Sequence, residues 1–189
     1  MHTCARLCGL VFGAIMIALS LAITAEVLLR KFAAHSLGGV DELAGYAVAV
    51  GAPLAFTVAL IERSHIRINL LHARMSPRAQ AVLNGTASLS LAALALALLA
   101  FAGATLLDTW RYGSIAQTPW ATPLIYPQTA WLLATAVFAA AACVYAARAL
   151  GLMLRRDWRT LNRRYGPETI EEELAAELDD LAQREGAVK

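Results

Sequence analysis

The sequence predicts an all-α membrane protein with four transmembrane helices. Its 189 residues are 59% hydrophobic and only 16% charged, and the mean hydropathy is +0.56. A soluble domain usually carries about 25% charged residues, so this composition favours the membrane class. Predominantly apolar segments long enough to cross a bilayer lie at about residues 9–29, 43–61, 84–107 and 127–153.

The first apolar segment has a charge in front of it, as a secretory signal does. However, it runs from Gly9 to Leu29, which is longer than the apolar region of a signal, and it ends on Arg30 and Lys31 without a clear cleavage pattern. We therefore expect it to be retained as the first span. Gly9 and Gly13 have the GxxxG spacing that permits close helix contact.

Glu26 is the one acidic residue inside the first segment, four residues before Arg30. It could be a proton or ion site, because charges within a membrane span are costly and often functional. Its place near the end of the span favours the simpler interpretation, an intrahelical pair with Arg30.

The second span begins with an acidic pair, Asp41 and Glu42, which follows a Gly-Gly turn. Acidic residues complement the positive end of a helix and can accept hydrogen bonds from its free N–H groups. We expect the pair to cap the helix and to meet a partner or Arg30, the alternative being a cap alone. Small residues recur at every fourth position and predict a face for close helix packing: Ala47, Gly51, Ala55 and Ala59.

The segment from 62 to 75 mixes apolar residues with arginines and is expected to lie as an amphipathic stretch in the headgroup layer. Arg63, His65 and Arg67 would bind lipid headgroups or a partner subunit there, or they would act only as a topology signal. Ser76 followed by Pro77 predicts the start of the third helix, since a serine cap before a first-turn proline is a strong helix start.

The connection before the fourth span is rich in aromatic residues and prolines. Aromatic residues beside membrane spans form an interfacial belt more often than a ligand-stacking site. In the fourth span, small residues again recur at every fourth position and predict a packing face: Ala139, Cys143, Ala147 and Gly151.

Residues 155–189 are expected to form a tail separate from the membrane domain of residues 1–154. The tail is first basic and then acidic, and its apolar spacing favours a soluble helix at about 167–184, with a solvated or disordered tail as the alternative. Arginines concentrate in the segment 62–75 and in this tail. The positive-inside rule therefore predicts that both termini are cytoplasmic, although Arg30 and Lys31 argue against it.

The sequence offers little of the chemistry that a catalytic or metal site requires. His35, His65 and His72 lie outside the predicted spans, so haem binding between mid-membrane histidines is not expected. The three cysteines form no CxxC pair, and no predicted span has an ionisable residue near its centre. We expect no enzyme activity, no cofactor and no metal, and the arginine clusters fit lipid headgroups better than nucleic acid.

A series of motifs runs in order from the end of the first span to the start of the fourth. Arg30 and the acidic pair are followed by Gly51, by the run HIRINLL at 65–71, and by Pro77; Thr118, Pro119, Pro123 and Pro127 then precede the last span. In this order and spacing, the chain resembles the small membrane subunit of tripartite ATP-independent periplasmic (TRAP) transporters, the DctQ type, over about residues 5–154. That family usually has a tryptophan shortly before the acidic pair, where this chain has Gly39 and Val40.

The resemblance implies a non-catalytic subunit in the bacterial inner membrane. Its partners would be a larger multi-span permease subunit, a periplasmic solute-binding protein and membrane lipids. In that family the large subunit binds substrate and sodium and moves as an elevator, so the complex would import an organic acid. The small subunit would enlarge the static scaffold and contribute to docking the binding protein, with no substrate-binding residue of its own.

Two rival functions are compatible with the same residues. One is a self-contained small oligomeric transporter or channel, with Glu26 or Asp108 lining the path. The other is a membrane oxidoreductase subunit, which an absorbance spectrum free of haem and flavin would eliminate.

Overall fold

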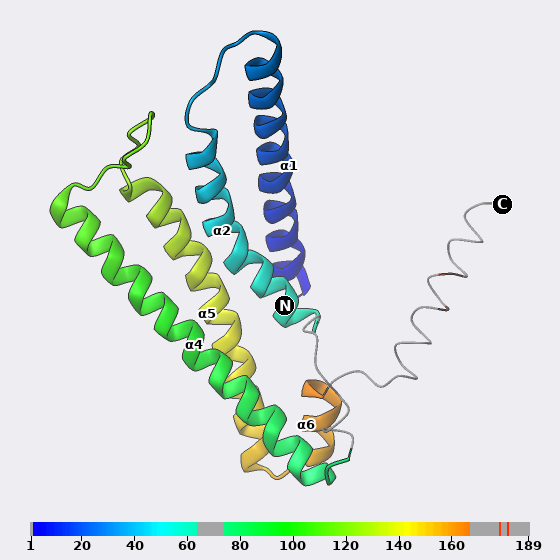
Figure 1. Cartoon of the computed structure of the whole chain (residues 1–189). Coiled ribbons are helices and arrows are strands. Elements are labelled where there is room, and N and C mark those ends of the chain that lie inside the picture. Colours follow the sequence, from blue (N-terminus) through cyan, green and yellow to red (C-terminus); the bar gives the residue numbers. More distant parts are fainter. Residues whose placement is uncertain (1, 64–73, 167–177, 179–180, 182–189) are drawn as a thin grey trace.

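A computed structural model describes residues 2–63, 74–166, 178 and 181 (Figure 1). The described residues form five helices, and the first four are long and apolar enough to cross a membrane. The predicted all-α fold with four membrane helices is therefore confirmed. The helices are α1 (His2–Phe32), α2 (Val40–Ile61), α4 (Pro77–Tyr112), α5 (Ile125–Leu154) and α6 (Trp158–Tyr165). The predicted amphipathic segment at 62–75 falls almost entirely outside the described residues, as does the predicted helix at 167–184.

The start of α4 is as the sequence predicts. Ser76 is the N-cap residue and Pro77 occupies the first helical position, and the Ser76 hydroxyl accepts a hydrogen bond from the Ala79 N–H at 3.4 Å. The helix ends at Tyr112, and the φ of 58° at the following Gly113 provides the left-handed turn that commonly closes a helix.

The start of α2 differs from the prediction. Gly39 is the N-cap residue and no side chain caps the helix, so the expectation that Asp41 caps it is wrong. The physical reason is the turn itself, because Gly38 and Gly39 both have positive φ and allow the helix to begin at Val40. Asp41 and Glu42 thus lie inside the first turn, where their charge still complements the helix dipole.

The long helices form two hairpins that stand side by side (Figure 1). Helix α1 packs on α2, α2 on α5, and α5 on α4, so the order in space is α1, α2, α5, α4. Because α1 is at the edge of this row, most of its surface remains outside the fold, and only 6% of its most apolar stretch is buried.

The α4–α5 pair has the tightest core. Most buried positions on α4 are three, four or seven residues apart, which fits the seven-residue period of a left-handed coiled coil. Nearly all are small, so the two backbones can approach closely. They include Ala81, Gly85, Ala92, Ala95, Ala102 and Thr109, facing Phe138, Ala139, Ala142, Ala146 and Ala149 on α5.

The predicted packing stripes are only partly used within this fold. Gly51 is buried, and a Cβ atom there would lie 3.1 Å from Cδ2 of Phe12, so this glycine gives α1 its close approach to α2. By contrast, Ala147 is exposed, and a Cβ atom at Gly151 or Gly13 would have no neighbour within 4 Å. An every-fourth-residue stripe rotates about 40° per step around a helix of 3.6 residues per turn, so it leaves the contact face after two or three steps. Of the remaining stripe residues, Ala139 is buried, Gly9 has only Val58 within 4 Å, and Ala47, Ala55 and Ala59 are half-buried.

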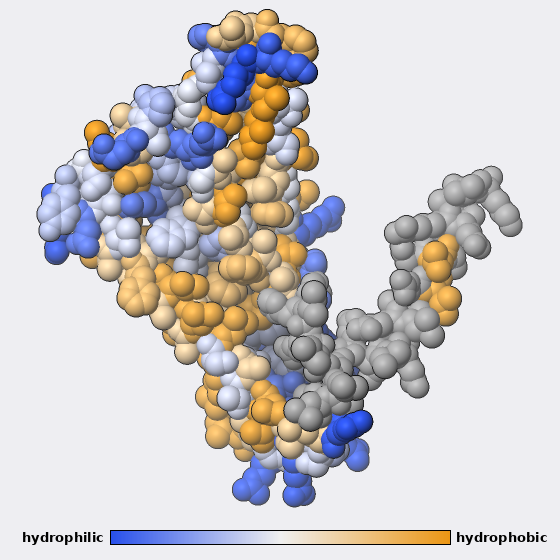
Figure 2. Space-filling model, in the orientation of Figure 1, coloured by the Kyte–Doolittle hydropathy of each residue, from blue (hydrophilic) through white to orange (hydrophobic). Residues whose placement is uncertain are grey.

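Hydropathy divides the surface into a broad apolar band with hydrophilic groups at both ends (Figure 2). We call one end the loop end, formed by the connections 33–39 and 113–124, and the opposite end the α6 end. The connection 113–124 is folded on itself through an isolated bridge between Ile115 and Pro123. The two ends therefore carry most of the polar structure on which a function could depend.

Candidate functional site

At the loop end, Glu42 joins the start of α2 to the connection between α4 and α5. Its side chain is buried and accepts hydrogen bonds from the Tyr46 hydroxyl at 2.6 Å and from the Thr118 hydroxyl. Thr122 also donates to it. Glu42 does not pair with Arg30, contrary to one of the expectations; instead it fixes a loop that is 76 residues away in the sequence.

The two connections also meet at Gly39. The Trp120 ring lies so close that a Cβ atom at Gly39 would be 2.6 Å from Cε2 of the indole. The φ of Gly39 is +118°, which L side chains rarely adopt. Pro119 lies beside Gly38 in the same way, at 3.8 Å from the position of a Cβ atom there. We call the joined segments 36–42 and 114–122 the loop platform.

Glu26 anchors the other side of the platform. Its carboxylate accepts hydrogen bonds from Arg30 Nη2 at 2.7 Å, from the Ser36 hydroxyl at 2.5 Å and from the Leu37 N–H at 2.7 Å. The pair with Arg30 is therefore confirmed, and the other two bonds hold the connection 33–39 against the end of α1. Sequence spacing could suggest the Arg30 contact, but the contacts with Ser36 and Leu37 depend on the turn and could not be read from it.

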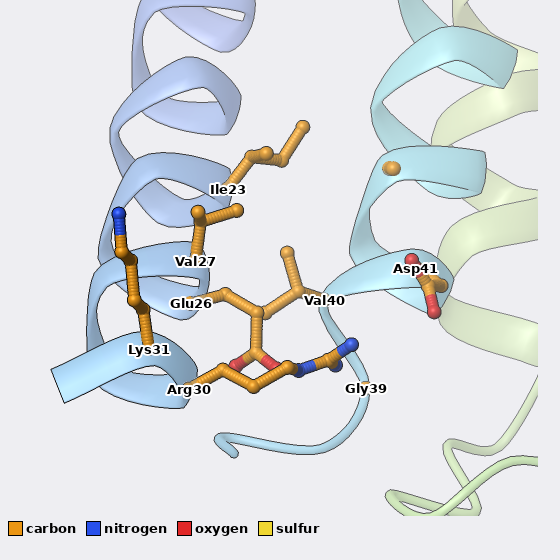
Figure 3. Close-up of a pocket in the computed structure, with 9 residues that line it drawn as sticks. Ile23, Glu26, Val27, Arg30, Lys31, Gly39, Val40 and Asp41 are labelled. Carbon is orange, nitrogen blue, oxygen red and sulfur yellow. The ribbon is translucent and has the colours of Figure 1, made fainter. Parts of the chain in front are cut away.

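A pocket of about 460 Å³ lies beside this anchor, between the end of α1 and the start of α2 (Figure 3). The Arg30 side chain extends from α1 across the space toward α2, and Val40 points from α2 toward Glu26 and Val27 (Figure 3). The lining combines apolar and charged residues: Ile23, Glu26, Val27, Arg30, Lys31, Gly39, Val40, Asp41 and Ala44.

The α6 end contains a cluster that the sequence interpretation missed. Leu161 of α6 is fully buried with Ala81 of α4 and Ala149 of α5. Burial raises the pKa of Tyr165, and its neutral hydroxyl donates to the Tyr145 carbonyl at 3.1 Å. The Tyr145 hydroxyl in turn donates to the Ile61 carbonyl at 3.2 Å, which connects the cluster to the end of α2.

Polar contacts complete the attachment of α6. Asn162 donates to the Pro77 carbonyl at 2.8 Å and accepts from Asn84, a buried residue of α4, at 3.2 Å. Arg63 donates to the Arg163 carbonyl at 3.2 Å. Of the predicted lipid or partner contacts, Arg63 is thus exposed and bonded to α6, whereas His65 and Arg67 lie outside the described residues.

Both buried carboxylates among the described residues are occupied by donors from the chain's own loops and helices. The part of the chain that the structure describes contains no group of three or more His, Cys, Asp or Glu residues that could hold a metal ion. What the described residues build is a set of fixed connections at the two ends of apolar helices.

Four membrane-capable helices with polar attachments at their ends define a multi-pass membrane protein. The family model described as "Tripartite ATP-independent periplasmic transporters, DctQ component" matches residues 19–152. This range covers most of the chain, so the chain belongs to the DctQ family and is a small component of a TRAP transporter. The comparison with curated proteins found no match.

The Trp120 contact lies next to the acidic pair in space. No tryptophan comes shortly before Asp41 and Glu42 in the sequence, where Gly39 and Val40 stand. In the structure an indole nevertheless lies beside this turn, but it comes from Trp120 of the other connection.

Proposed function

We propose that this chain is the non-catalytic scaffold subunit of a sodium-driven TRAP transporter that imports an organic acid across the bacterial inner membrane. The observation that supports the proposal is that the buried carboxylates of this chain bind its own loops. Glu26 and Glu42 each receive several hydrogen bonds that fix loops, which gives the subunit rigid ends. Rigid ends suit a static support for a moving partner, whereas an ion path needs polar groups that can exchange partners.

The large permease subunit and the periplasmic solute-binding protein would bind at different places. Helix α1 exposes large apolar side chains along its length, so the permease or lipid can cover it within the membrane. The loop platform presents the Trp120 side chain, 47% exposed, on a backbone fixed by Glu42. It would contribute to docking the binding protein.

The docking role requires the loop platform to face the periplasm. Arginines of the described residues concentrate at the α6 end, and they include Arg63, Arg74, Arg78, Arg155, Arg156, Arg159, Arg163 and Arg164. By the positive-inside rule we expect this end and both termini to be cytoplasmic, with residues 155–189 as a cytoplasmic tail of a membrane domain of residues 1–154. Cys4 is exposed, so a membrane-impermeant maleimide should label it only after the inner membrane is permeabilised. Labelling in intact spheroplasts would contradict this orientation.

Substituting Glu42 tests the docking role. In the assembled transporter, we expect Glu42→Gln to raise the concentration of binding protein that gives half-maximal uptake, because a neutral amide accepts the Tyr46 and Thr118 hydrogen bonds more weakly. The large subunit should still co-purify. Asp108→Asn is the matched control, since Asp108 is exposed and its only ion pair among the described residues is with Arg111 at 3.9 Å. An unchanged half-maximal concentration in Glu42→Gln would contradict docking at the platform.

A further inference from the structure

The pocket between α1 and α2 has the volume of a small-molecule site and lies where two membrane helices meet the hydrophilic end of the fold. Its volume of about 460 Å³ lies within the roughly 300–1,000 Å³ of small-molecule sites. It is at the end of two membrane helices, at the boundary between apolar and hydrophilic surface. Among the long helices, α1 makes substantial contacts only with α2, so its other sides are free of the described fold. In a bilayer, lipid would reach the pocket from those free sides.

The positive side of the pocket belongs to α1. Arg30 uses one guanidinium nitrogen for Glu26, and its side chain is still 68% exposed, so further N–H donors face outward. Lys31 follows directly, with its ammonium group 5.5 Å from the centre of the Phe32 ring. The Lys31 side chain runs along α1 away from the Arg30 guanidinium (Figure 3), so the free N–H donors of Arg30 are what this side offers a phosphate group.

The negative side belongs to α2. Asp41 is exposed in the first turn of the helix, and it makes no ion pair among the residues that the structure describes. Its carboxylate lies on the other side of Arg30 from Lys31 (Figure 3). The pocket therefore presents the Arg30 guanidinium on one helix and an unengaged carboxylate on the other.

Apolar side chains continue from these charges toward the membrane interior. Ile23 and Val27 of α1 are 42% and 56% exposed, and Ala44 of α2 adds a small side chain opposite them. A ligand that fits would need an anionic group, a hydrogen-bonding cation a few bonds away, and a hydrocarbon chain attached to the anionic side.

We propose that this pocket binds a phospholipid whose headgroup carries a primary amine, such as phosphatidylethanolamine. The phosphate accepts hydrogen bonds from Arg30, the ammonium group donates to Asp41, and an acyl chain follows Ile23 and Val27. A choline headgroup has the same charges but no N–H donor for Asp41, and a glycerol headgroup has no cation at all. The lipid would occupy the edge helix at the loop end and support the turn on which the loop platform rests.

Lipid binding to the purified, delipidated chain tests this assignment. Ethanolamine, choline and glycerol phospholipids with identical acyl chains are titrated in detergent and bound lipid is counted by native mass spectrometry. We expect the ethanolamine lipid to bind about fivefold more tightly than the choline lipid, the size of one well-placed exposed ion pair. Asp41→Asn should remove this preference, and Arg30→Gln should weaken the binding of both lipids alike.

The matched control is Arg111→Gln, because Arg111 is also at the loop end and its side chain is 68% exposed, as that of Arg30 is. It should leave all three affinities unchanged. Equal binding of ethanolamine and choline lipids by the unaltered chain would overturn the proposal, as would an ethanolamine preference that survives in Asp41→Asn. Loss of binding in Arg111→Gln equal to that in Arg30→Gln would also overturn the proposal, because the lipid would then respond only to net charge.

Discussion

Replacing Leu161 by alanine tests how α6 is held against the membrane helices. An isolated helix of fewer than about 12 residues is marginal in water, and α6 has 8 residues. Its structure therefore depends on packing, and Leu161, with no exposed surface, is at the centre of that packing. Removing three buried carbon atoms from a leucine costs about 2–5 kcal/mol.

This cost should appear as local opening of α6. Since about 1.4 kcal/mol changes an equilibrium tenfold, the amide hydrogens of α6 should exchange roughly 30-fold to a few thousand-fold faster in Leu161→Ala. Hydrogen–deuterium exchange with peptide-level mass spectrometry in nanodiscs measures the effect, with α4 as the internal reference. Leu154→Ala is the matched control, because it is the same change at a side chain that is 77% exposed. Equal exchange of α6 in the two variants would refute the inferred packing.

Three further perturbations address the loop end, the α6 cap and the arginines. Gly39→Ala should destabilise the fold by about 1–3 kcal/mol of backbone strain, and further by displacing the Trp120 ring. Combining it with Trp120→Ala should remove the cost of displacing the ring but leave the strain. Thermal unfolding of the single and double variants measures both contributions. The Thr160 hydrogen bonds to the Asp157 carboxylate hold its pKa below the ordinary 3.8. The cap that the Asp157 carboxylate provides for α6 should therefore be fully present above pH 3.8 and be lost as the pH falls through the lowered pKa. In Asp157→Asn, hydrogen exchange of the α6 amides should depend less on acidification. Arg63→Glu with Arg67→Glu should weaken assembly or alter orientation without changing substrate preference, and a changed preference in uptake competition would contradict the scaffold role.

Local features of the sequence were sufficient to predict the membrane helices. Apolar length specifies a span directly, and the Ser76–Pro77 cap acts through neighbouring backbone groups, so both can be read locally. Packing register could not be read in the same way. Helix α5 has alanine at so many positions that Ala146 and Ala147 look equivalent in the sequence, although one is buried and the other exposed.

The polar attachments were harder still to predict, because each joins segments that are far apart in the sequence. Glu42 looks like a helix-start residue until Thr118 is brought beside it, and nothing near Gly39 in the sequence indicates the Trp120 ring. Helix α6 was hidden for another reason. Its arginines gave residues 155–164 the appearance of a solvated basic run, whereas Leu161 and Tyr165, one turn apart, form the face that packs.

Uptake by reconstituted proteoliposomes tests the central claim most directly. Vesicles containing this chain alone, the large permease subunit alone, or both are given the solute-binding protein, a loaded organic acid and an inward sodium gradient. A scaffold subunit predicts no uptake with this chain alone and sodium-dependent uptake with the complete set. Solute uptake or ion current through vesicles that contain only this chain would contradict the account.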